Sequence, residues 1–82
     1  MSITKTQLGE ERLLVHTESG RLMRARLYRE ISLGRKGYRL ILKGDASSSW
    51  ERHNLEAQTD DNARAEANKL IKSFGLKLAK SA

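Results

Sequence analysis

The alternation of apolar and polar side chains predicts strands along most of the chain. Side chains of a strand point to opposite faces at successive positions, so a period of two indicates a half-buried sheet. This pattern predicts four strands, the last more polar than the others, at residues 12–17, 22–33, 38–43 and 50–57. Short connections make neighbours in sequence into neighbours in the sheet. We therefore expect an antiparallel meander.

The segment from Arg21 to Leu33 is ambiguous between helix and strand. Its Leu, Met, Ala and Arg content favours a helix, but its apolar residues scatter around a helical wheel. With a period of two, five of them share one face, interrupted only by Arg29: Met23, Ala25, Leu27, Ile31 and Leu33,. We predict a long strand, bulged near Arg29 so that this side chain leaves the core.

A helix is predicted at residues 60–74. Thr59 is a suitable N-cap, and Asp60 and Asp61 place negative charge at the positive end of the helix,. Gly75 then ends it,. Its apolar residues form one stripe, made of Ala63, Ala67, Leu70, Ile71 and Phe74,.

These elements predict an α+β fold, a small β-β-β-β-α sheet meander with the C-terminal helix packed on one face. We expect a flexible N-terminal segment at 1–10, a single domain at 11–78 and a tail at 79–82. The predicted core is Leu13, Val15, Met23, Leu27, Ile31, Leu40, Leu42, Leu70, Ile71 and Phe74. The second face of the sheet is left open to solvent.

The composition is that of one small domain. A chain of 82 residues has room for one core, and it contains no cysteine that could add a disulfide or a thiolate metal ligand,. Neither a signal peptide nor an apolar run long enough to span a membrane is recognisable,. We expect a soluble cytoplasmic protein that does not bind membranes.

Positive charge is concentrated in one window. Residues 21–43 hold eight basic residues against one acid, Glu30, which gives this window +7, while the other 59 residues sum to −1. Such clustering is typical of proteins that bind an anionic partner. A solvated surface that keeps the protein soluble is the alternative.

No residue pattern indicates catalysis, a metal site or a cofactor. His16 and His53 are the only histidines, and without cysteine they fall short of the four ligands of a zinc site,. The serines at 47–49 lie in a predicted loop, which holds attack geometry poorly. We therefore expect a protein that is not an enzyme and has no cofactor.

The tetrapeptide Gly34-Arg35-Lys36-Gly37 resembles the GxxG loop of KH RNA-binding domains, which clamps the nucleic-acid backbone between two helices,. Here the following residues, Tyr38 to Lys43, predict a strand instead of the second helix. A four-residue hairpin loop is the preferred interpretation.

The open sheet face holds the candidate binding residues. With Met23, Ala25 and Leu27 inward, strand alternation turns their neighbours outward together. The predicted nucleic-acid-binding residues are Arg24, Arg26, Tyr28, Arg39 and Lys43 on this face, with Arg35 and Lys36 at the hairpin tip. His16 is expected beside them. Arginine binds phosphates, and tyrosine stacks on bases.

Two hypotheses follow. The first is a module that binds DNA or RNA, and in outline a small sheet backed by one helix resembles the sheet-reading DNA-binding domains at the N-termini of some tyrosine integrases. The second is a protein-interaction module, a homodimer or an adaptor, that uses a sheet edge or binds an acidic protein. Trp50 motivates the second hypothesis, because aromatic residues are enriched at interfaces,; a core position is the preferred interpretation for it.

Overall fold

The computed structural model describes residues 3–45 and 48–79. Six strands and one helix follow one another as β1 (Thr4–Gln7), β2 (Arg12–His16), β3 (Leu22–Ser32), β4 (Arg35–Gly44), β5 (Glu51–Leu55), α1 (Asp60–Ser73) and β6 (Leu76–Leu78). Apart from Ala79, the predicted tail at 79–82 lies outside the described residues, as do residues 1–2 and residues 46–47 of the predicted loop.

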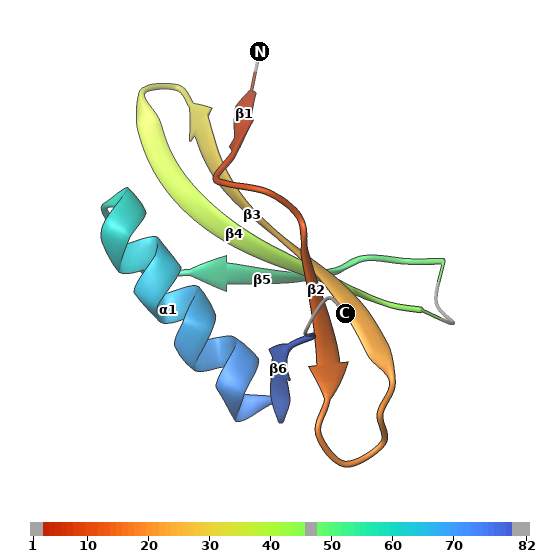
Figure 1. Cartoon of the computed structure of the whole chain (residues 1–82). Coiled ribbons are helices and arrows are strands. Elements are labelled where there is room, and N and C mark those ends of the chain that lie inside the picture. Colours follow the sequence, from red (N-terminus) through yellow and green to blue (C-terminus); the bar gives the residue numbers. More distant parts are fainter. Residues whose placement is uncertain (1–2, 46–47, 80–82) are drawn as a thin grey trace.

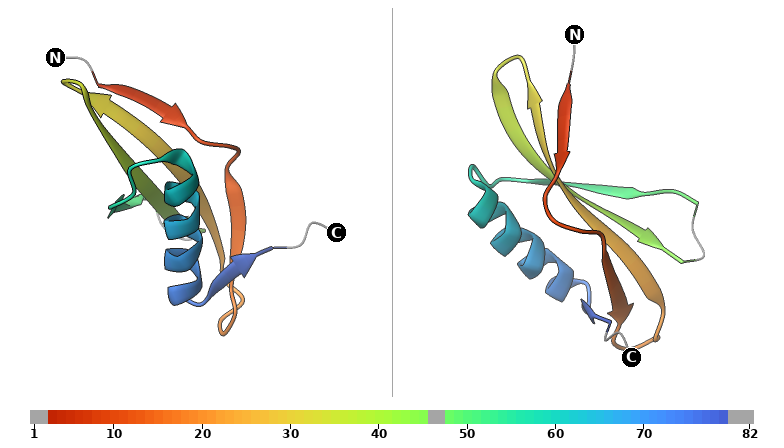
Figure 2. Two further views of the ribbon diagram at one scale, coloured as in Figure 1. Left: turned by 90° about the vertical axis from the view of Figure 1, so that its left-hand side faces the viewer. Right: turned by 45° about the horizontal axis from the view of Figure 1, so that its top comes forward.

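The strands form one antiparallel sheet in the order β5-β4-β3-β2-β6, and β1 also pairs with β3. The helix α1 packs against one face of this sheet (Figure 1; Figure 2, left). The α+β class and the four-strand meander, β2 to β5, are confirmed. Two strands, β1 and β6, were not predicted.

The strand β1 lies within the segment that we expected to be flexible. Residues 4–7 pair with β3, from Thr4 opposite Ile31 to Gln7 opposite Tyr28. All four side chains are exposed, so no apolar alternation marks this strand. Both β1 and β2 pair with β3, but the connection from Gln7 to Arg12 is two residues longer than the stretch of β3 opposite it, from Tyr28 to Ala25,. Gly9 lies in this connection and has a positive φ of 79°.

The hairpin between β3 and β4 is tighter than predicted. Its turn consists of Leu33 and Gly34, both with positive φ, 52° and 74°. Two such residues form the type I′ turn that matches the twist of the flanking strands. Consequently β4 begins at Arg35, and Lys36 pairs with Ile31 inside the strand. The predicted four-residue loop is wrong, because three residues of this tetrapeptide belong to β4. The KH interpretation is also wrong, since strands and not helices form both arms of the hairpin.

Arg29 remains on the helix side of β3 without a bulge. The pairing of β3 with β4 is unbroken on both sides of it. Its Nη1 donates to both carboxylate oxygens of Asp60, at 3.0 and 3.2 Å, and the Tyr38 hydroxyl donates to the same carboxylate. A partner on α1 therefore makes the predicted bulge unnecessary.

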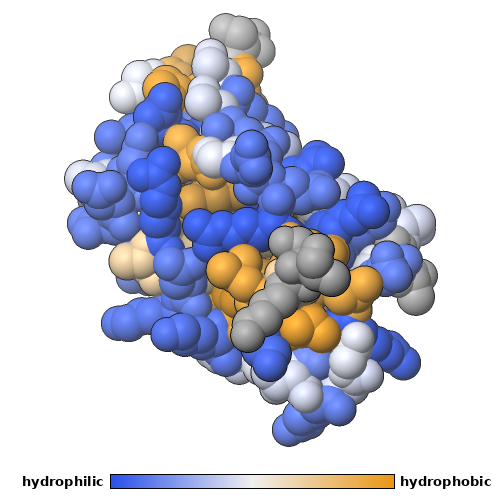
Figure 3. All heavy atoms as spheres, in the orientation of Figure 1, coloured by the Kyte–Doolittle hydropathy of each residue, from blue (hydrophilic) through white to orange (hydrophobic). Residues whose placement is uncertain are grey.

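The core lies between α1 and the sheet. Its buried residues are Leu14, Ala25, Leu27, Tyr38, Leu40, Leu42, Ala63, Ala67, Ile71 and Leu76. Four of the predicted core residues are confirmed, namely Leu27, Leu40, Leu42 and Ile71. Seen as in Figure 1, hydrophilic residues cover much of the surface, and apolar residues are visible around β2 and β6 (Figure 3).

Of the other six predicted core residues, two were misplaced because β2 turns its other face to the helix. Leu14 pairs with Met23 on the helix side, so Leu13 and Val15 point to the opposite face. Of the remainder, Met23 and Leu70 pack at the edge of the core, while Ile31 and Phe74 are exposed. These two lie near the ends of β3 and α1.

The helix begins and ends as predicted. The Thr59 hydroxyl accepts a hydrogen bond from the backbone N–H of Asn62 at 3.2 Å,. Gly75, with a φ of 72°, follows the C-cap Phe74,. None of the helices in the described part of the chain is long and apolar enough to cross a membrane.

Candidate nucleic-acid interface

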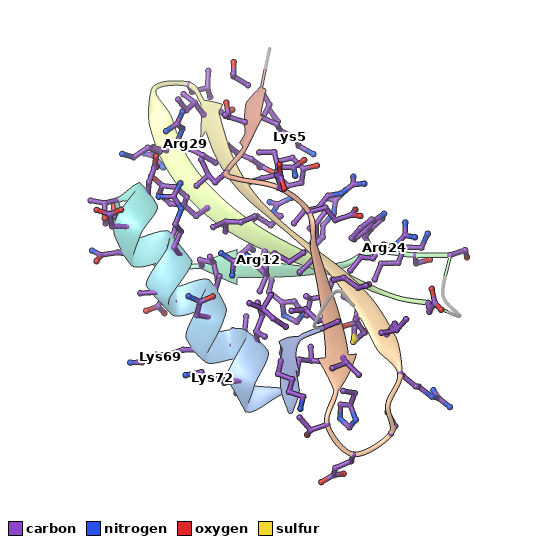
Figure 4. The ribbon with its side chains drawn as sticks, in the orientation of Figure 1. Lys5, Arg12, Arg24, Arg29, Lys69 and Lys72 are labelled. Carbon is purple, nitrogen blue, oxygen red and sulfur yellow. The ribbon has the colours of Figure 1, made fainter. Side chains whose placement is uncertain are left out.

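Five of the predicted binding residues lie on the outer face of the sheet, the face opposite α1. Strand pairs that bury core residues, Ala25 with Leu42 and Leu27 with Leu40, alternate with pairs that point outward. The outward pairs are Arg24 with Lys43, Arg26 with Ile41, and Tyr28 with Arg39. Figure 4 shows Arg24 directed away from α1 and Arg29 directed toward it.

Two residues that we did not predict join them. Arg52 of β5 pairs with Ile41 and therefore also points outward. Trp50 immediately precedes β5, and the register of β5 continues to place it opposite Lys43. The Arg26 guanidinium lies 4.7 Å from the centre of the Trp50 ring, and the Lys43 ammonium lies 5.8 Å from it.

Trp50 is therefore half-buried beneath cations on the outer face, and the core position preferred for it is wrong. The alternation of polar side chains in residues 50–57 indicated that alternate residues share a face. The pairing of β5 with β4 is needed to tell which of these residues lie on the outer face. We refer to the surface formed by these seven residues as the basic face: Arg24, Arg26, Tyr28, Arg39, Lys43, Trp50 and Arg52.

Two cations of the basic face are held by carboxylates. Arg26 Nε donates to Glu11 Oε1 at 2.7 Å, and Arg39 Nη1 lies 3.5 Å from Glu30 Oε1. The pKa of Arg26 is raised above its ordinary value, mainly by the hydrogen bond with Glu11 and to a smaller extent by the hydrogen bond with Tyr28. These pairs hold the two side chains in defined positions, and they neutralise part of the charge.

The other cations of the basic face lack a carboxylate partner. Within residues 3–45 and 48–79, no ion pair involves Arg24, Lys43 or Arg52. The basic face has five cations, and in the described residues these form ion pairs with only two carboxylates, those of Glu11 and Glu30. The basic face therefore has an excess of positive charge. The excess is concentrated beside Trp50, where Arg24 and Lys43 are direct strand partners.

The remaining predicted site residues are not brought together with these. Arg35 pairs with Ser32 at the exposed end of the hairpin, eight residues along β3 from Arg24. Lys36 lies on the helix side, 5.8 Å from the centre of the Tyr38 ring. His16 pairs with the buried Leu76 and contacts the Ser19 hydroxyl, so it is not beside the basic face.

Both histidines lie outside the basic face. His53 faces α1, with its ring centre 5.2 Å from that of Phe74 and its Nε2 3.7 Å from Glu51 Oε2. Among the described residues, no three potential metal ligands gather in one place.

No protein-family model, no curated protein and no solved structure matches this chain. What the basic face offers chemically is a set of guanidinium and ammonium donors with two aromatic rings, on strands whose opposite side packs against α1.

Proposed function

We propose that this protein is a non-enzymatic module that binds nucleic acid, DNA or RNA, through the basic face. The observation that carries the proposal is the gathering of cations around Trp50, on a sheet face that α1 leaves uncovered. Lysine and arginine contacts to phosphates supply most of the affinity of sequence-independent nucleic-acid binding. Arginine also binds a phosphate through two parallel hydrogen bonds.

A protein-interaction module is the second candidate, and the position of β5 favours it. This strand is at the end of the sheet, so a second chain, including another copy, could pair with its free edge,. However, β5 carries Glu51 and Arg52, and charged side chains on an edge strand oppose such pairing,. The basic face would also suit an acidic protein partner.

The test compares two double variants with the same change in charge. Arg24→Glu with Lys43→Glu reverses two cations of the basic face, whereas Lys69→Glu with Lys72→Glu reverses two exposed cations of α1 (Figure 4). Fluorescence anisotropy with labelled mixed-sequence DNA and RNA measures affinity at several salt concentrations. We expect the first variant to lose at least about 10-fold in affinity, and the second to remain close to wild type.

The salt dependence gives an independent measure. Three to five phosphate contacts predict that log K falls with log salt at a slope of about −2 to −4.5. Equal losses in the two double variants would reject the basic face as the site. An absence of wild-type binding to DNA and RNA at low salt would reject the nucleic-acid proposal and favour a protein partner, with light scattering then testing for a homodimer.

One substitution should strengthen binding. Glu11→Gln removes the carboxylate that neutralises Arg26 and would repel a phosphate at the same place,. We expect affinity to rise several-fold at low salt. As a control, Glu66→Gln removes an acid of α1 and should leave affinity unchanged, because Glu66 instead accepts from the Glu56 backbone N–H. A weaker Glu11→Gln variant would contradict the role given to Arg26.

A further inference from the structure

Trp50 has an unusual position for the only tryptophan of a small domain. An indole ring carries a large apolar surface, and small domains normally use it in the core. Here the ring lies on the outer face, half-buried, with the cations of Arg26 and Lys43 within 6 Å of its centre,. An aromatic ring with cations beside it is the combination that binds a stacked base and its phosphate.

Tyr28 is the second aromatic residue of the basic face, and it is too far from Trp50 to bind the same base. Trp50 lies opposite Lys43, which pairs with Arg24, and Tyr28 follows Arg24 by four residues on β3. This offset is about 13 Å along the strand and about 10 Å across the sheet. The two rings would therefore contact different bases of one strand.

Cations occupy the space between the two rings. Arg26 lies between Arg24 and Tyr28 on β3, and Arg39 is the strand partner of Tyr28. Aromatic and cationic side chains thus succeed one another across the face. A single strand offers bases and phosphates in the same succession, and its bases are free to stack on a protein ring. In a duplex the bases are already stacked on one another, and only their edges are accessible.

We infer that the basic face binds single-stranded nucleic acid, with one base stacked on Trp50 and its flanking phosphates held by Arg24 and Lys43. This inference rests on the proposed function. Stacking tolerates every base, so little sequence preference is expected. In the free protein Arg26, held by Glu11, lies over the indole ring, so this guanidinium moves aside when a base stacks on that face.

Because the chain has one tryptophan, its fluorescence reports on this site alone. The wild-type protein is titrated with dT12, with rU12 and with a 12-base-pair DNA duplex at one salt concentration. We expect the two single strands to quench Trp50 emission and to bind at least about 5-fold more tightly than the duplex. Comparing dT12 with rU12 shows whether DNA or RNA is preferred within this class.

Substitutions then separate stacking from charge. Trp50→Ala should weaken single-strand binding by roughly 5- to 150-fold, with little effect on the duplex, while Trp50→Phe should retain much of the affinity. Phe74→Ala is the matched control, because Phe74 is a partly exposed aromatic residue near the C-terminal end of α1. Circular dichroism checks that each variant is folded. If Trp50→Ala is not, the quenching of wild-type emission and the preference for single strands over the duplex still test the inference.

The outcomes distinguish this inference from the proposed function. Duplex binding that equals or exceeds single-strand binding would overturn it, as would unchanged Trp50 emission together with unchanged affinity of Trp50→Ala. In either case, loss of binding in the Arg24→Glu and Lys43→Glu variant would still support the proposed function. If wild-type protein binds none of the three ligands, the proposed function itself fails.

Discussion

Leu14 is the position at which the orientation of the sheet can be tested most directly. Its side chain is 1% exposed in the core, whereas that of Leu13, its neighbour, is 48% exposed on the outer face. Truncating a fully buried leucine to alanine removes its packing and leaves a cavity, at a cost of about 2–5 kcal/mol. An 82-residue domain has a total stability of only about 4–12 kcal/mol,.

Leu14→Ala should therefore lose a large part of the free energy of unfolding, and its melting temperature should fall by about 10 °C or more. Leu13→Ala is the matched control, with an expected cost below about 1 kcal/mol. Urea denaturation followed by circular dichroism measures both. An equal or larger loss in Leu13→Ala would show that β2 has the opposite register, and the assignment of the basic face to the outer side would need revision.

Three further substitutions test α1. Thr59→Ala should cost about 1 kcal/mol in thermal unfolding, because the backbone N–H of Asn62 loses its acceptor,. The hydrogen bond from Tyr38 lowers the pKa of Asp60. The ionised Asp60 carboxylate therefore stabilises the fold fully at neutral pH, and this contribution is lost as pH falls through the lowered pKa. In urea denaturation at pH 2–6, the free energy of unfolding of Asp60→Asn should not show this loss. Phe74→Ala should cost less than about 3 kcal/mol by urea denaturation, since the side chain is 40% exposed,.

The local part of the structure followed from the sequence. The cap Thr59, the apolar stripe and Gly75 specify α1 through contacts within a few residues, so its bounds needed no tertiary information. The same holds for the outward alignment of Arg24, Arg26 and Tyr28, because alternate residues of a strand share a face whatever the strand pairs with,.

The contacts between different elements were determined only by the tertiary structure. β2 has leucines on both faces, so alternation could not choose between Leu13 and Leu14, and the pairing with β3 made the choice. Arg29 could remain on the helix side because Asp60, 31 residues away in sequence, accepts its hydrogen bonds. Trp50 reaches the basic face through the register of β5 with β4. Each depends on residues of another element, and a period read along one strand contains no information about them.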